Sequence, residues 1–420
     1  MALNNREYSK RSTFLGLSSF QLLAMFRRGM FYTYLSQYMI EFLDLDVTIA
    51  SLYATLPMFM SVIFQNFVWG PLSDKLQRRR TFIILGEVLA GIGTIIVWFV
   101  HSTFSNLFLA GITIIIGLMC IEAFWSMSNI SWSALISDIY PSKDRSKIMG
   151  QLTSVGGFGR IIGISIGALL FNSGYGFRYG PLFFVAALVM FVSSIPMIFT
   201  PEGGIEFERN VEVEKNNYSS NNNNYKGIFI VFIISLTFIN FGRNSIATIY
   251  SPYLFLKSGF ALDEILVGYI ANSRSLATLT IGFLAGALSK KFGHSRTLIL
   301  GVSFAILALI ITGLTNSLIL IFVGNILFGT AEVIIYAASY AIASNLIPSK
   351  NRAKLFGAYN TTFFLSWGLA CTIISAPLID YLGKDNPISY QTAFFVGALI
   401  TGIGLIIFIV LEIWLHRHNR

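Results

Sequence analysis

The short basic segment Gly70-Pro71-Leu72-Ser73-Asp74-Lys75-Leu76-Gln77-Arg78-Arg79-Arg80-Thr81 separates two long apolar runs, residues 47–69 and 82–100. A basic cluster of this kind cannot lie in hydrocarbon, because a central Lys or Arg costs about 2.5–3.5 kcal/mol on insertion. The stretch is therefore predicted to be a turn outside the bilayer, and its positive charge indicates the cytoplasmic side. A similar sequence recurs at residues 286–297, which indicates a duplicated membrane protein.

The composition is typical of a membrane protein. Of the 420 residues, 55% are hydrophobic and 12% are charged, whereas about 25% are charged in a soluble domain. The net charge of +9 does not indicate a nucleic-acid partner, because most Lys and Arg residues lie in short turns between apolar runs. Cys120 and Cys371 lie inside apolar segments, so no disulfide framework is expected. The histidines and cysteines lack metal-ligand spacing, and we expect neither a metal site nor a cofactor.

A spanning helix needs about 20 mostly apolar residues, and this template predicts twelve of them. They cover residues 13–40, 47–70, 82–101, 105–137, 147–171, 179–199, 227–256, 263–287, 297–315, 317–345, 353–382 and 388–415. Residues 201–226 are polar, acidic and Asn-rich, a composition that cannot form a packed core. We therefore predict an all-α polytopic membrane protein with two six-helix halves, residues 1–200 and 227–420, joined by the linker 201–226.

The distribution of basic residues predicts the orientation. Alternate turns, both ends and the linker carry nearly all the basic residues outside the predicted helices, whereas the opposite set of turns holds only Arg178, Lys257 and Lys384. By the positive-inside rule, both termini and the linker are expected to be cytoplasmic in a multi-pass protein of the cell membrane.

The two halves also repeat in sequence. Seven of fourteen positions are identical between residues 137–150 and 344–357, and Phe26-Arg27-Arg28 parallels Phe241-Gly242-Arg243. Two parallel six-helix repeats with basic turns after the second and eighth helices describe one transporter architecture.

On these features the chain resembles the major facilitator superfamily over essentially its whole length. The family's loop signature is matched by Gly70, Asp74, Lys75, Arg78 and Arg79, with Gln77 in place of its second glycine. The second copy keeps a glycine, a lysine and a glycine, but Lys290 replaces the aspartate, and His294 and Ser295 stand at the paired basic positions. The resemblance implies that Asp74 faces the start of the eleventh helix, near Lys350–Lys354, and that Asp138 at the end of the fourth helix meets the basic side chains.

Several charged residues fall near mid-membrane. At 1.5 Å per residue, Arg28 and Arg243 lie roughly 22–24 Å along their predicted helices, near the middle of a core about 30 Å thick. Similar counting places Arg160, Arg274, Glu122 and Glu332 at comparable depth, and intramembrane charges are expected to face a cavity or find partners. Glu87 lies closer to the basic turn and is expected to pair with its charges.

The resemblance implies that these residues line a central cavity. We expect the substrate to be contacted by Arg28, Glu122, Asn129, Arg160, Arg243, Asn244, Arg274, Glu332 and Tyr336. These four arginines and Arg27, against two glutamates, favour an anionic or multiply hydroxylated solute, because guanidinium groups bind carboxylate and phosphate bidentately. Glu122 and Glu332 are candidate proton carriers. The alternative for individual residues is a structural ion pair, such as Glu122 with Arg160.

The sequence thus predicts a secondary transporter. The first alternative is a drug, multidrug or sugar efflux permease, although Gly163–Ala168 lacks the proline and the last glycine of the antiporter signature that the family's drug exporters carry. A non-transport membrane sensor of the same fold is the alternative from a different class. An enzyme is not expected, because no catalytic triad or nucleotide loop appears. The expected partners are a small-molecule substrate, protons and the lipid bilayer, and we expect a monomer.

Overall fold

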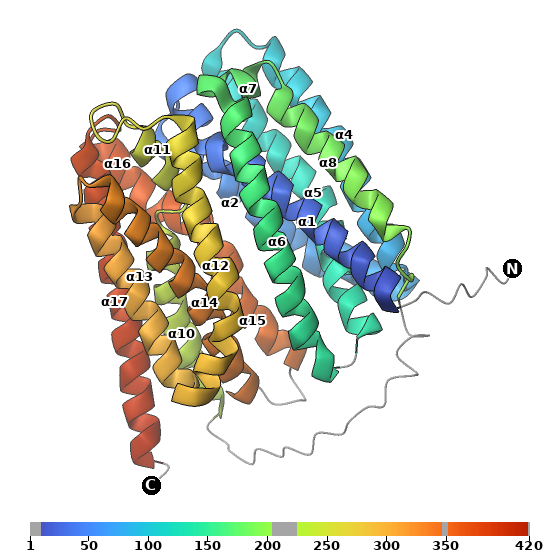
Figure 1. Cartoon of the computed structure of the whole chain (residues 1–420), viewed down its shortest axis with the longest axis vertical. Helices are drawn as coiled ribbons and strands as arrows, with labels where there is room; N and C mark the ends of the chain where they lie inside the picture. The colour runs from blue at the N-terminus through green and yellow to red at the C-terminus, as the bar shows by residue number, and fades with distance from the viewer. Residues whose placement is uncertain (1–9, 141, 204–224, 347–351, 419–420) are drawn as a thin grey trace, which may run out of the picture. The chain divides into compact units, whose positions relative to one another are not determined.

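The computed structural model describes residues 10–140, 142–203, 225–346 and 352–418. All the regular structure in this part of the chain is helical (Figure 1). Long apolar segments form helices here because a chain in lipid must satisfy every backbone N–H and C=O group internally.

Eight helices among the described residues are long and apolar enough to span a membrane. They are Val47–Leu76, Arg79–Thr103, Leu107–Ile136, Gln151–Arg178, Gly227–Asn244, His294–Leu314, Leu318–Ala343 and Pro387–Arg417. A ninth span arises if Ala358–Ser366 and Cys371–Leu382, which are bent by 52°, count as one. The other three expected spans fall on a 17-residue helix, Pro181–Met197, and on the charged helices Lys10–Gln37 and Glu264–Phe292. The count of twelve therefore stays a prediction.

The chain divides into two compact units. The first contains residues 1–33 and 57–214, and the second contains residues 34–56 and 215–420. The end of the first helix and the start of the second thus group with the C-terminal part of the chain.

The first unit is a set of packed helices. Its elements are α1 (Lys10–Gln37, up to residue 33), the later part of α2 (Val47–Phe64), η2 (Gln65–Trp69), α3 (Gly70–Leu76), α4 (Arg79–Thr103), α5 (Leu107–Ile139), α6 (Ser142–Phe171), η3 (Asn172–Gly174), α7 (Tyr175–Arg178) and α8 (Pro181–Met197). Figure 1 shows α8 lying along α4, which also packs against α5. Gly159 and Gly163 let α6 approach α1 closely, because a Cβ added at either would lie 2.2 or 2.0 Å from a backbone oxygen of α1.

The second unit has a similar set of packed helices. Its elements are η1 (Tyr38–Phe42), the start of α2, α10 (Tyr225–Asn244), α11 (Tyr250–Phe255), α12 (Glu264–Phe292), α13 (His294–Leu314), α14 (Leu318–Leu346), α15 (Arg352–Ser366), η5 (Cys371–Ser375), α16 (Ala376–Leu382) and α17 (Pro387–His418). Within it α13 packs against α14 and α17, while α10 packs against α15 and α17 (Figure 1). A core of apolar side chains that includes Phe232, Val302, Ile335 and Phe408 holds these helices together.

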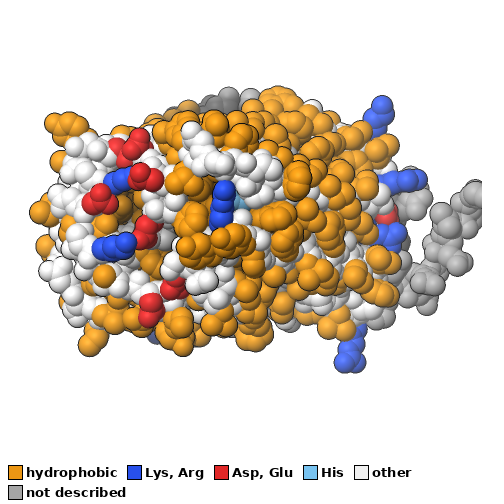
Figure 2. All heavy atoms as spheres, turned by 90° about the horizontal axis from the view of Figure 1, so that it is seen from above, with side chains coloured by type: hydrophobic (Ala, Val, Ile, Leu, Met, Phe, Trp, Pro, Cys, Tyr) orange, Lys and Arg blue, Asp and Glu red, His pale blue; other side chains and the backbone are white. Residues whose placement is uncertain are grey.

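Apolar side chains are abundant on the outside as well as in the core. Figure 2 shows that hydrophobic side chains cover much of the face seen from above. On α17 the exposed residues Leu399, Ile403, Ile406 and Val410 recur every three or four positions, which is one face of a helix. Such a stripe suits contact with lipid rather than water.

The start of α2 is held by an acidic side chain of α16. The Asp380 carboxylate accepts hydrogen bonds from the backbone N–H groups of Val47 at 2.8 Å and Thr48 at 2.9 Å. The first N–H groups of a helix have no intrahelical partner, and a negative charge there is favoured by the helix dipole. Two turns of α2 further on, Gly368 packs directly against the backbone of Thr55. These contacts explain why residues 34–56 belong to the second unit.

The basic turn after α3 is fixed by a network inside the first unit. The Arg79 guanidinium, which is 6% exposed, contacts Asp74 at 2.9 Å and Asp138 at 3.2 Å and donates to the Ser73 hydroxyl at 2.7 Å. Arg79 thus links Asp138, at the end of α5, to Asp74 in the basic turn. The other expected partner of Asp74, the segment Lys350–Lys354, lies outside the residues whose side chains the structure describes.

The remaining members of the predicted loop motif lie around this network. Gly70 begins α3, and Lys75 is in its last turn. Arg78 is the residue that precedes α4. Arg80 forms an ion pair with Glu202 at 3.0 Å, a partner from the predicted linker that the sequence did not indicate.

Candidate functional site

A polar cluster in the first unit is organised around Trp125 of α5. The Arg28 guanidinium carbon lies 4.4 Å from the centre of the Trp125 ring, and that of Arg27 lies 5.1 Å from it. A cation over an indole face is attracted by the ring quadrupole, and the attraction is worth about 2 kcal/mol or more when the pair is desolvated. Both arginines belong to α1, so that this contact joins α1 to α5.

Glu87 of α4 fixes the orientation of this tryptophan. Its carboxylate is 1% exposed and accepts hydrogen bonds from Trp125 Nε1 at 2.8 Å and Ser128 Oγ at 2.9 Å. The expectation that Glu87 pairs with the charges of the basic turn is therefore wrong. Counting residues from the turn placed it near the surface, whereas its side chain points across to α5 inside the unit.

Glu122 lies one turn before Trp125 on α5, and it is 6% exposed. Its carboxyl is close enough to the Ser61 hydroxyl for a hydrogen bond and close enough to Arg28 for electrostatic attraction. Arg160 of α6 is half-buried, and its backbone oxygen packs against Gly29 of α1. Asn129 is half-buried two turns beyond Glu122 on α5. The structure thus brings Glu122 and Arg28 together.

A second polar cluster surrounds Arg243 in the second unit. Arg243 is 9% exposed, donates from Nε to the side-chain oxygen of Asn240 at 3.0 Å, and lies 5.8 Å from the centre of the Phe363 ring. Asn244 donates to Ser366 Oγ at 2.9 Å. Helix α10 therefore carries Arg243 between two side-chain amides, those of Asn240 and Asn244, and each amide makes a side-chain hydrogen bond.

A cavity of about 130 Å³ opens beside this arginine. It is lined by Arg243, Asn244, Glu332, Tyr336, Phe363 and Trp367. Four of these six were predicted from the sequence, and the two aromatic side chains of the α15 region, Phe363 and Trp367, were not. A guanidinium and an amide among aromatic walls form the usual composition of a small-molecule site, which is apolar with a few fixed polar groups.

Arg274 of α12 and Glu332 of α14 form an ion pair at the edge of this cluster. Arg274 donates to Glu332 Oε2 from Nε at 3.2 Å and from Nη2 at 2.9 Å. The two side chains are 23% and 33% exposed. Arg243 experiences the charges of both. The pair leaves Glu332 accessible from the cavity.

The charge balance differs from the one expected from the sequence. Glu87 joins the first cluster as a third acidic side chain beside the two expected ones, Glu122 and Glu332, against the five arginines counted from the sequence. Among the described residues, no three His, Cys, Asp or Glu side chains gather into a metal site.

Comparison with known proteins points to one family. The family model of the Major Facilitator Superfamily matches residues 17–236 and again residues 232–420. Multidrug resistance protein 2 of Bacillus subtilis (strain 168) is 25% identical over 359 residues, covering 82% of this chain and 81% of the relative. A probable 4-methylmuconolactone transporter of Cupriavidus pinatubonensis (strain JMP 134 / LMG 1197) is 28% identical over 148 residues, covering 35% of this chain and 33% of the relative.

Solved structures share the fold. A bacterial homologue of the human lysosomal transporter Spinster, in an inward-facing and occupied conformation, superposes with a TM-score of 0.71 at 14% identity, covering 97% of this chain and 98% of the other. The nucleoside transporter NupG gives a TM-score of 0.69 at 15% identity, covering 95% and 99%. At these identities the likeness concerns the fold alone.

Proposed function

Because the chain belongs to the Major Facilitator Superfamily and is a transporter of that type, we propose that it moves a small polar or anionic organic solute by alternating access. In this mechanism two halves of the protein rock around a binding site near the middle of the membrane. The proposal includes twelve spans in two six-helix halves, 1–200 and 227–420, a cytoplasmic linker, cytoplasmic termini and a location in the cell membrane.

The cavity beside Arg243 carries this proposal. The Arg243 guanidinium offers planar, paired donors that suit a carboxylate or phosphate group. The amide of Asn244 adds a second polar group, and the aromatic side chains of Phe363 and Trp367 supply walls. In the first unit Arg28 stands at the repeat-related position, and we propose that it contacts the same solute. Asn129, Arg160, Arg274 and Tyr336 are the further proposed substrate contacts.

We further propose that proton movement is coupled to transport through Glu122 and Glu332. Each carboxylate lies beside an arginine, Arg28 in one case and Arg274 in the other. Substrate binding that draws the arginine away would leave the carboxylate without its positive neighbour and favour uptake of a proton. Uptake that remains driven by a pH gradient in the variant Glu122→Gln/Glu332→Gln would contradict this coupling.

Export of drug-like molecules is the second candidate function. It is favoured by the similarity to Multidrug resistance protein 2 over 82% of this chain and by the aromatic walls of the second cluster. The two candidate functions differ in the charge of the transported molecule. An anionic solute needs the Arg243 guanidinium, whereas an exported lipophilic drug should bind equally well without it.

The experiment that tests the function is a thermal-shift screen of the purified chain. Organic anions, sugar phosphates, sugars and lipophilic drugs are compared at two pH values, with Arg243→Ala as the matched variant. The proposal expects an anionic or hydroxylated compound to raise the melting temperature of the wild type and to have no effect on Arg243→Ala. A response confined to lipophilic drugs, and equal in both proteins, would favour the second candidate.

A further inference from the structure

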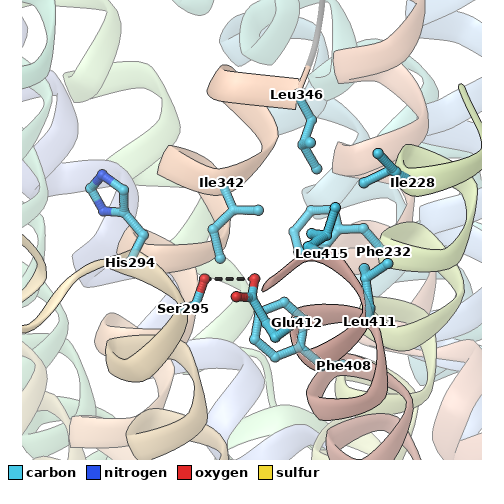
Figure 3. Close-up of a pocket in the computed structure, with 10 residues that line it drawn as sticks. All are labelled: Ile228, Phe232, His294, Ser295, Ile342, Leu346, Phe408, Leu411, Glu412 and Leu415. Carbon is cyan, nitrogen blue, oxygen red and sulfur yellow. Dashed lines mark hydrogen bonds between the residues drawn. The ribbon is translucent and has the colours of Figure 1, made fainter. Parts of the chain in front are cut away.

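A second cavity, of about 210 Å³, lies in the second unit at the end where α10 and α13 begin and α14 and α17 finish (Figure 3). Its walls are apolar side chains of α10, α14 and α17, among them Phe232, Ile342 and Phe408. It shares no lining residue with the cavity beside Arg243. The cavity therefore plays no part in the proposed substrate site.

One carboxylate faces this apolar space. Figure 3 shows Glu412 of α17 among the lining residues, and one of its carboxylate oxygens accepts a hydrogen bond of 2.7 Å from the Ser295 hydroxyl. Among the described residues, no basic side chain lies within salt-bridge distance of Glu412. An ionised carboxyl can accept about four hydrogen bonds, so that most of this capacity is open to a ligand.

The repeat in the sequence explains why the space exists. In the alignment of residues 286–297 with 70–81, Ser295 stands where Arg79 stands in the first unit. The Arg79 side chain is buried there and contacts two carboxylates. In the second unit the short serine takes that place. His294, the other residue at the paired basic positions, turns its ring away from Glu412 and bonds to Ser289 (Figure 3). The second unit thus lacks this internal cation. Lys290 and Asn345 also replace the two aspartates that Arg79 contacts, and the carboxylate at Ser295 comes instead from Glu412 of α17.

We propose that this cavity binds a small organic cation, whose primary ammonium group pairs with Glu412 and whose apolar body packs against Phe232, Ile342 and Phe408. An engineered apolar cavity of about 150 Å³ binds benzene, so that the larger volume here admits one ring or a short alkyl chain. The ammonium supplies hydrogen-bond donors and a positive charge to the unused lone pairs of Glu412. A soluble amine and the ethanolamine headgroup of a phospholipid share this chemistry.

The test uses the full chain in nanodiscs of choline phospholipid, with 2-phenylethylamine as the probe and 2-phenylethanol as its neutral isostere. The melting temperature is expected to rise in a saturable way with the amine and not with the alcohol. The variant Glu412→Gln should lose the response, whereas Asp385→Asn, an exposed acid at the other end of the same unit, should keep it. A response to the alcohol equal to that to the amine, or a response that survives in Glu412→Gln, overturns the proposal.

Nanodiscs that contain ethanolamine phospholipid distinguish the two sources. If the lipid headgroup is the ligand, the wild type melts higher in this lipid than in choline lipid, the amine adds nothing further, and Glu412→Gln removes the difference. If a soluble amine is the ligand, the amine response is the same in both lipids. The absence of any response to either the amine or the lipid contradicts the proposal.

A second variant tests the origin of the site. Ser295→Arg returns a guanidinium to the position that Arg79 occupies in the first unit, next to Glu412. We expect this variant to melt at a higher temperature than the wild type without any ligand and to be unresponsive to 2-phenylethylamine. A full amine response in folded Ser295→Arg contradicts the proposed site. If this variant does not fold, the comparison of Glu412→Gln with Asp385→Asn still tests whether Glu412 binds the amine.

Discussion

Removal of the Asp380 carboxylate should loosen the start of α2. Two backbone N–H groups, those of Val47 at 2.8 Å and Thr48 at 2.9 Å, donate to it. Loss of a side chain that caps a helix N-terminus costs about 0.5–2 kcal/mol, and the helix dipole adds about 0.3–1 kcal/mol for a negative charge. We therefore expect Asp380→Ala to weaken this contact by about 1–2 kcal/mol. Asp380→Asn, whose amide oxygen still accepts one bond, should weaken it by about half as much.

This free energy has a consequence for the transport cycle. If alternating access separates α2 from α16, a weaker contact raises the population of the separated state by the same free energy. A change of about 1–2 kcal/mol corresponds to a factor of about 5–30 in an equilibrium constant. Asp380→Ala should therefore raise the open fraction about five- to thirty-fold, and Asp380→Asn should lie between it and the wild type.

Thiol labelling measures this fraction. Ser51, which is 2% exposed on the first turns of α2, is replaced by Cys in a background that carries Cys120→Ser and Cys371→Ser. The rate of reaction with a membrane-impermeant maleimide should be highest in Asp380→Ala, intermediate in Asp380→Asn and lowest in the wild type. The exposed control Asp385→Asn should match the wild type. Equal labelling rates in all four proteins would refute the reasoning.

The other predictions concern the two clusters and one turn. Glu87→Gln should lower the melting temperature by the equivalent of about 1–2 kcal/mol, because an amide replaces the carboxyl group whose Oε1 serves two buried donors. Arg274→Met should lower the melting temperature more than Arg274→Met/Glu332→Leu does, because the single change leaves the Glu332 carboxylate without its partner. The two side chains are 23% and 33% exposed, so we expect a coupling free energy of about 1–2 kcal/mol in a double-mutant cycle. Additive effects of the two changes would contradict this expectation. Gly203→Ala should destabilise the chain in the same melting assay, because φ is +77° there and a Cβ would lie 2.7 Å from a neighbouring side chain, whereas an unchanged melting temperature would show that the turn relaxes freely.

Polar residues that were placed at mid-depth by counting, and that lie on one helix, line a common cavity when their helical spacing puts them on one face. Glu332 and Tyr336 are four residues apart on α14 and line one cavity, and Arg243 and Asn244 of α10 join them there. This arrangement follows from helix geometry, because residues three or four apart point to the same side. The charged loop was likewise predictable, since basic residues are excluded from hydrocarbon.

The sequence did not predict contacts that depend on which helices become neighbours. Glu87 bonds to Trp125, 38 residues away on α5, and a count of residues along α4 cannot show how that helix is rotated. Asp380 caps a helix more than 300 residues earlier in the chain. Both side chains act at the end of an element or across an interface, where no periodic pattern marks them. The aromatic walls of the cavity beside Arg243, Phe363 and Trp367, were not predicted, because aromatic residues in membrane helices more often serve packing or interface anchoring.

We propose that Arg28 and Arg243 both hold the solute, and transport by the reconstituted protein tests this role. The compound that stabilises the wild type in the thermal-shift screen is used as the transported solute in proteoliposomes. We predict that Arg28→Ala and Arg243→Ala each reduce transport to the level of empty liposomes, while Arg296→Ala, an exposed arginine of α13, transports like the wild type. Wild-type transport by both Arg28→Ala and Arg243→Ala, at equal protein content, would contradict the account.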